Sequence, residues 1–156
     1  MPEIPFPPVL GSPAVTSLPV SPVIPVIPSF WRLPADPASV RLARRVVAES
    51  LPYDGRSQLA GDLGLLTSEL VTNAVRYGPQ PADDHVVELV LWPADGHYWV
   101  AVSDAGTGTP SVASPGPEVG NGRGLMLVES VSDAWTVVPR RTCGKSVVAG
   151  IRLPSD

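Results

Sequence analysis

Cysteine and basic residues are both scarce in this chain. Cys143 is the single cysteine among 156 residues, which excludes an internal disulfide and a zinc site built on cysteines. That scarcity is typical of a protein of the reducing cytoplasm. Eleven Lys and Arg against 15 Asp and Glu give a net charge of −4. The chain therefore lacks the broad basic surface expected of a protein that binds nucleic acid.

Long apolar runs are missing as well, even from the apolar N-terminal segment. Residues 1–28 hold nine of the 20 prolines and lack a basic stretch at the start. Proline fixes φ and removes a backbone donor, so this segment is neither a helix nor an interior strand. We expect residues 1–29 to be a disordered, polyproline-like tail or a docking segment for a partner. A signal peptide and a membrane-spanning helix are not expected.

The remaining residues, 30–156, have the composition of one globular domain, in a chain that is 44% apolar. Asp36-Pro37 is typical of a helix start, and Gly78-Pro79 of a helix end. The expected elements are a strand at 30–33, helices at 38–50 and 57–77, strands at 86–92 and 98–103, a helix at 125–132, and strands at 134–138 and 146–153.

Two features of this order define the expected architecture. Neighbouring strands joined by hairpin loops, such as residues 93–96, indicate a mainly antiparallel sheet with the helices gathered on one face. The fold class predicted is therefore α+β, a two-layer sandwich. Residues 104–122 have no helical or strand period and are rich in glycine and proline. A loop of that length inside a compact domain is usually functional, for example as a lid.

The helix expected at 57–77 carries the first candidate site. Glu69 and Asn73 are four residues apart, so their side chains lie one above the other on one helix face. Magnesium prefers oxygen ligands and takes only one or two from protein when substrate phosphates supply others. The Asn73 carboxamide suits that role, and the Glu69 carboxylate suits a general base. The same pair is also found on ordinary solvated helix faces.

Two glycine-containing stretches complete the pattern. Asp104 directly follows an apolar strand, where its carboxylate could accept a hydrogen bond from an exocyclic amine. Gly106 and Gly108 follow it and allow a ligand to approach the backbone closely. Three more glycines, Gly120, Gly122 and Gly124, precede a helix start, which is a ready anion site. In isolation, these stretches are equally consistent with a turn and a loop.

Other nucleotide and metal motifs are absent. Gly144-Lys-Ser146 resembles the end of a phosphate-binding P-loop, but Pro139 stands where that motif has its first glycine. Leu125 stands where the dinucleotide-binding fingerprint that would begin at Gly120 has its third glycine. His85 and His97 have no partners at metal-ligand spacing.

The order of these motifs resembles that of the Bergerat-fold ATPases, the histidine-kinase, gyrase-B and MutL superfamily. The motifs are Glu-x3-Asn, then Asp-x-Gly-x-Gly, then Gly-x-Gly-Leu. The resemblance covers residues 30–154. The stretch Thr-Ser-Glu69-Leu-Val-Thr-Asn73-Ala-Val-Arg-Tyr-Gly78 is especially similar to the small stand-alone branch, which includes the anti-sigma-factor serine kinases. No histidine-bearing helix pair precedes residue 30, so a complete sensor histidine kinase is not expected.

The resemblance implies ATP and Mg²⁺ as cofactors and a role for each motif. Glu69 would be the catalytic base and Asn73 the magnesium ligand. Asp104 would read the adenine, in a pocket shaped by Gly106 and Gly108. The remaining implied cofactor-binding residues are Gly122, Arg123, Gly124 and Leu125 at the phosphates, and Ser146, which stands where the superfamily commonly has a threonine beside the adenine.

The resemblance also implies partners. We expect a cytoplasmic regulator that contacts an anti-anti-sigma-type protein, a sigma factor or both, with a homodimer through the N-terminal strand and first helix as a further implication. One departure concerns the lid arginine of characterised anti-sigma kinases, because residues 117–121 contain none and the nearest is Arg123.

The sequence therefore leaves three readings open. The first is a serine/threonine kinase. The second is a non-catalytic module that binds ATP as a switch and sequesters a sigma factor or another signalling protein. The third is a scaffold that has lost its nucleotide.

Overall fold

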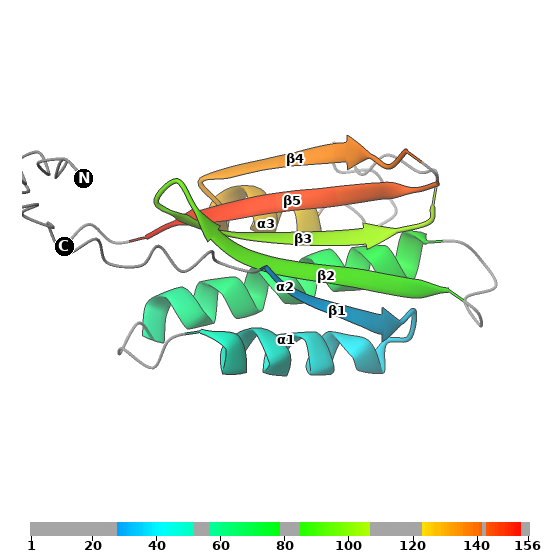
Figure 1. The fold of residues 1–156 in the computed structure, drawn as a ribbon, viewed down its shortest axis with the longest axis horizontal. Coiled ribbons are helices and arrows are strands. Elements are labelled where there is room, and N and C mark those ends of the chain that lie inside the picture. The colour runs from blue at the N-terminus through cyan, green and yellow to red at the C-terminus, as the bar shows by residue number, and fades with distance from the viewer. Residues whose placement is uncertain (1–27, 52–56, 79–84, 107–122, 142, 154–156) are drawn as a thin grey trace, which may run out of the picture.

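The computed structural model describes residues 28–51, 57–78, 85–106, 123–141 and 143–153. Its elements follow the order seen in Figure 1: β1 (Ser29–Pro34), α1 (Ala38–Ser50), α2 (Ser57–Tyr77), β2 (Val86–Ala94), β3 (His97–Asp104), α3 (Arg123–Val131), β4 (Ala134–Pro139) and β5 (Lys145–Arg152). Residues 1–27 of the predicted tail and most of the predicted lid lie outside the described residues. Ser29, the last residue of the predicted tail, is the first residue of β1.

The strands form one sheet in the order β1-β2-β3-β5-β4, and every neighbouring pair is antiparallel. Figure 1 looks onto this sheet, with α2 and α3 behind the strands and α1 beside α2. In the sheet, β5 lies between β3 and β4. The connection from β3 to β4, which contains α3, therefore spans the position that β5 occupies. The predicted two-layer α+β fold is confirmed.

The core lies between α2 and the sheet. Leu63, Leu66 and Leu70 of α2 are at most 1% exposed, and Leu89 and Val100 of β2 and β3 are fully buried opposite the helices. Successive side chains of a strand point to opposite faces, so alternate residues of each central strand enter this layer. Burial of a leucine side chain contributes about 1.5–3 kcal/mol, so α2 is held in place mainly by this apolar stripe.

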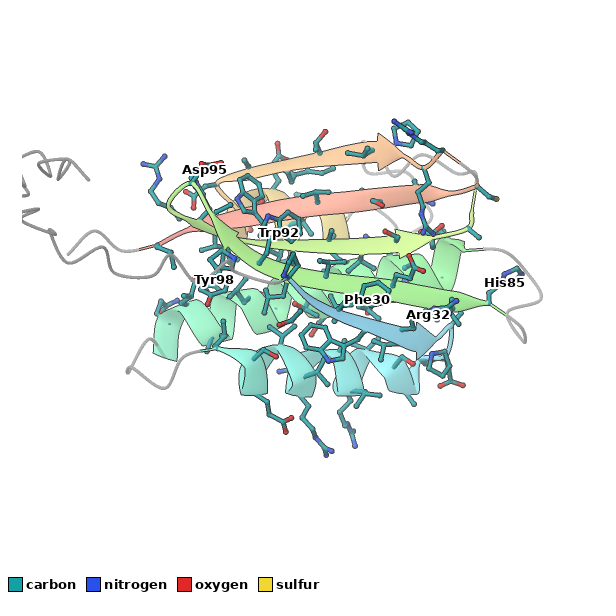
Figure 2. The ribbon with its side chains drawn as sticks, viewed as in Figure 1. Phe30, Arg32, His85, Trp92, Asp95 and Tyr98 are labelled. Carbon is teal, nitrogen blue, oxygen red and sulfur yellow. The ribbon has the colours of Figure 1, made fainter. Side chains whose placement is uncertain are left out.

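The β2–β3 hairpin sets the register of the central strands. Asp95 and Gly96 have φ angles of 51° and 71°, as a tight turn with two left-handed residues requires. Figure 2 shows Asp95 at this turn and His85 at the opposite end of β2. Pro93 belongs to β2 and is tolerated there because β1 pairs with β2 only as far as Leu91.

The predicted element bounds agree closely for the long helices and less well elsewhere. The second helix spans the predicted 57–77. The last helix begins at Arg123, two residues before the predicted 125, so Gly124 belongs to its first turn and not to the preceding loop. No helix among the described residues is both long and apolar enough to span a membrane.

Candidate functional site

Asp104 occupies the last position of β3 and is 4% exposed. Its Oδ1 atom accepts two hydrogen bonds, from the Gly106 backbone N–H at 2.7 Å and from the Lys145 Nζ at 3.1 Å. A buried charge is tolerated only when it is paired and hydrogen-bonded. The Gly106 N–H and the Lys145 ammonium group therefore hold the carboxylate in one orientation.

The C-terminal end of α2 closes over this carboxylate. A Cβ atom on Gly106 would lie 2.8 Å from the Tyr77 carbonyl oxygen and 3.2 Å from the Gly78 Cα. Any side chain at residue 106 would therefore push β3 and α2 apart. The glycine that the sequence pattern assigned to the base pocket is required here by close backbone approach.

Gly144 brings the start of β5 against the end of β3. Its φ is +87°, and a Cβ there would lie 2.6 Å from the Ala105 Cα. The neighbouring Cys143 Sγ donates to the Ala105 carbonyl oxygen at 3.2 Å. Lys145 follows Gly144 in the chain. The close approach at Gly144 therefore holds Lys145 directly opposite Asp104 in the antiparallel register.

Lys145 was not among the sequence-predicted site residues. It is 8% exposed, and with Asp104 it makes up the buried charged residues among those that the structure describes. The sequence gives no sign that a lysine at the start of a strand is buried. It could have been found only from the pairing of Asp104 with Lys145, which depends on knowing that β5 lies beside β3.

Glu69 and Asn73 share one face of α2, as their spacing predicted. Both are half-buried, and neither makes a hydrogen bond or ion pair with another described residue. One further helical turn along the same face leads to Tyr77 and Gly78, which contact the Asp104 region. The structure thus places the C-terminal end of the helix that carries Glu69 and Asn73 beside Asp104.

Ser146 is not brought into this group. Its hydroxyl lies 2.6 Å from the hydroxyl of Ser103, its partner across the strands. Since neighbouring residues of a strand point to opposite faces, Ser103 and Ser146 face away from the layer that contains Asp104 and Lys145. The side chain beside the Asp104 carboxylate belongs to Lys145 and not to Ser146.

The glycine-rich stretch is described only in part. Gly108 and Gly122 lie outside the described residues. Arg123 and Gly124 form the first turn of α3, and Leu125 is 2% exposed. The helix packs against α2, so the N-terminal amides of α3 belong to the same layer as Glu69 and Asn73.

The donor set suits magnesium bound through a nucleotide better than a metal held by protein alone. No group of three or more His, Cys, Asp or Glu side chains that could hold a metal ion occurs within the described ranges. Magnesium commonly takes one or two protein oxygens and completes its shell with phosphates and water. The Asn73 carboxamide, which bonds to no described residue, meets that requirement. The Asp104 carboxylate, beside the C-terminal end of α2, offers a polar acceptor for a purine amine.

A buried acid at a strand end, a helix bearing Glu and Asn, and an antiparallel sheet with helices on one face make up the α+β arrangement that the sequence predicted. Residues 33–149 match the family described as the histidine kinase-like ATPase domain. The chain belongs to this family, which implies that it binds ATP.

One solved structure supports the fold of that family. The Erythrobacter litoralis EL346 blue-light activated histidine kinase is 26% identical, with a TM-score of 0.52 over 78% of this chain and 42% of that one. The histidine kinase domain from the same protein is 25% identical, with a TM-score of 0.49 over 77% of this chain and 61% of that one. This chain thus spans about two fifths to three fifths of these structures' lengths. A comparison with curated proteins finds no match.

Proposed function

We propose that this protein is an anti-sigma-type serine/threonine kinase, a cytoplasmic transcription regulator that binds ATP with Mg²⁺ and phosphorylates a serine on a small anti-anti-sigma-type partner. The observation that carries the proposal is the placement of Glu69 and Asn73 on one face of α2, with the buried and oriented Asp104 of β3 beside the C-terminal end of that helix. Glu69 and Asn73 bond to no other residue that the structure describes. In its other state the protein would hold a sigma factor.

The length of α2 supports the proposed placement of the nucleotide. At about 1.5 Å rise per residue, Glu69 and Gly78 are roughly 13 Å apart along the helix axis. An extended nucleoside triphosphate with its base at Asp104 would therefore reach the Glu69 region with its terminal phosphate. Asn73 lies between the two, where the phosphate chain and its Mg²⁺ would pass.

The proposed chemistry assigns one task to each residue. Glu69 takes the proton of the attacking serine hydroxyl while the serine oxygen bonds to the terminal phosphorus and the bond to the ADP oxygen breaks. Asn73 would hold Mg²⁺, which neutralises phosphate charge when bound. Positioning and charge neutralisation supply most of the catalysis in phosphoryl transfer. The backbone amides of Arg123 and Gly124 at the α3 N-terminus suit a phosphate.

The first prediction concerns phosphotransfer. Purified protein is incubated with γ-labelled ATP, Mg²⁺ and candidate anti-anti-sigma proteins from the same cell. We expect transfer to one partner, and a fall of about 100-fold or more for Glu69→Gln, because a general base contributes about 10²–10⁴-fold. ATP affinity, measured by calorimetry, should change by less than about threefold, since Glu69 acts on the hydroxyl.

Ser68→Ala is the matched control on the neighbouring position of α2, because the Ser68 hydroxyl donates to the Gly64 carbonyl within the helix and has no assigned role. It should keep wild-type transfer. Label transfer that survives Glu69→Gln unchanged would contradict the catalytic assignment.

A non-catalytic module that binds ATP as a switch and sequesters a sigma factor is the second candidate. It is favoured by the lack of an arginine in residues 117–121, where characterised anti-sigma kinases have one. Under this alternative, calorimetry would show ATP binding, and a sigma factor would be retained on immobilised protein in an ATP-dependent way. No partner would become labelled.

A homodimer belongs to the same proposal and would use β1 and α1. Phe30 and Leu42, one on each element, are 53% and 41% exposed. β1 is also an edge strand of the sheet, and edge strands are a common site of pairing between chains.

A further inference from the structure

The ion pair between Asp104 and Lys145 is more enclosed than a surface salt bridge. The two side chains are 5% and 10% exposed, and the Nζ–Oδ1 distance is 3.1 Å. The other ion pairs described, Arg32 and Arg140 with Glu88, have side chains that are 22% to 63% exposed. Asp104 and Lys145 therefore lost far more hydration on folding than these surface pairs did.

Fold stability alone is a poor reason to bury such a pair. Desolvation of two charges offsets much of their attraction, and replacement of a buried pair by apolar residues of similar size is often neutral or stabilising. The surrounding strand positions, Val102 and Val147, are apolar and buried, so the site itself could accept an apolar pair. The charges at this end of the sheet call for another explanation.

The geometry at the carboxylate supplies one. Lys145 and the Gly106 N–H both donate to Oδ1, whereas Oδ2 receives no hydrogen bond from any residue in the described ranges. Two donors on one oxygen fix the rotation of the carboxyl group and hold Oδ2 in a single direction. A pre-oriented acceptor binds a ligand amine more tightly and more selectively than a freely rotating one, because no ordering is needed on binding.

We propose that Lys145 is a positioning residue that makes Asp104 selective for a purine with a 6-amino group. This inference rests on the proposed nucleotide site and goes beyond it by assigning base selection to a pair instead of to Asp104 alone. The fixed Oδ2 accepts the amine of adenine and repels the 6-oxo group of hypoxanthine or guanine. The register of β3 and β5 and the close contact at Gly144 hold the lysine in position.

The test compares the dissociation constants of ATP and ITP, whose bases differ at the 6 position, for the full-length protein by calorimetry. We expect wild-type protein to bind ATP about 10- to 100-fold more tightly than ITP, the range of one hydrogen bond to a charged group. Lys145→Met keeps the length of the side chain and removes its donors, so it should lower the ratio to about threefold or less. Lys145→Gln, with a neutral donor, should give an intermediate ratio.

Asn73→Ala is the matched control, because a phosphate-side change should weaken ATP and ITP equally and leave the ratio unchanged. Thermal unfolding shows which variants are folded. A folded Lys145→Met or Lys145→Gln protein that keeps the wild-type ratio overturns the inference, and so does wild-type protein that binds ATP and ITP equally. Wild-type protein that binds neither nucleotide overturns the proposed function and, with it, this inference.

Discussion

At the scale of single residues, the meeting of β3, β5 and α2 depends on positions where a side chain has no room. Gly106 and Gly144 allow the backbones of these elements to approach each other around Asp104. Gly144 is the more demanding of the two, because its positive φ excludes most side chains even without a steric conflict. The orientation of the candidate site is therefore set by backbone contacts as much as by side chains.

Gly144→Ala should destabilise the protein by about 2–3 kcal/mol or more, since it combines a strained φ with a clash against the backbone of Asp104 and Ala105. Chemical denaturation measures the loss in unfolding free energy. Gly61→Ala is the control, because Gly61 is a helical glycine with nothing within 4 Å of its Cβ position. That variant should gain about 0.5–1 kcal/mol from helix propensity. Equal effects at the two positions would contradict the packing described around Gly144.

At the scale of elements, α2 has two functions on two faces. One face fills the core with Leu63, Leu66 and Leu70, and the other presents Glu69 and Asn73. The apolar face fixes the helix against β3, so it also fixes the distance between the candidate catalytic residues and Asp104. Loss of packing on α2 should therefore affect both stability and nucleotide binding.

Leu66→Ala should cost about 2–5 kcal/mol of stability, because it leaves a cavity under α2. Its neighbour Leu65 is 39% exposed against 1% for Leu66, so Leu65→Ala should change the unfolding free energy by less than about 1 kcal/mol. Urea unfolding of both variants, followed by circular dichroism, measures the difference. If the two variants were equally stable, the assignment of the buried face would be wrong.

At the scale of the whole molecule, the site joins segments that are distant in the chain. The candidate residues come from α2, from the end of β3 and from the start of β5. A ligand that bridges these elements binds only the folded state, so it must stabilise the protein as a whole. Nucleotide binding is therefore measurable without any knowledge of the partner.

ATP with Mg²⁺ at about 100 times its dissociation constant should raise the unfolding free energy by about 2.7 kcal/mol. Omission of Mg²⁺ should remove part of this stabilisation, and Asn73→Ala should make the remaining effect insensitive to Mg²⁺. Differential scanning calorimetry measures these shifts. The control is Gln58→Ala at the far end of α2, where Gln58 donates to Asp62 at the surface. An Asn73→Ala protein with the full magnesium response would contradict the ligand assignment.

The long elements and the fold class could be predicted from sequence because their signals are local or repetitive. α2 has both an apolar stripe and an end signal at Gly78, and its bounds agree with those predicted. The start of α3 was less predictable, because Gly124 is typical of a loop but lies in the first turn of the helix. The roles of Glu69, Asn73 and Asp104 remain predictions until nucleotide binding is measured.

Sequence alone determined which residues share a helix face, because a four-residue spacing places Glu69 above Asn73 wherever the helix lies. It also indicated that Asp104 directly follows an apolar strand. Tertiary structure decided which residue of β5 meets that carboxylate. A shift of one residue in strand register exchanges the two faces, so the choice between Lys145 and Ser146 depends on the pairing of β3 with β5, strands that are far apart in the chain.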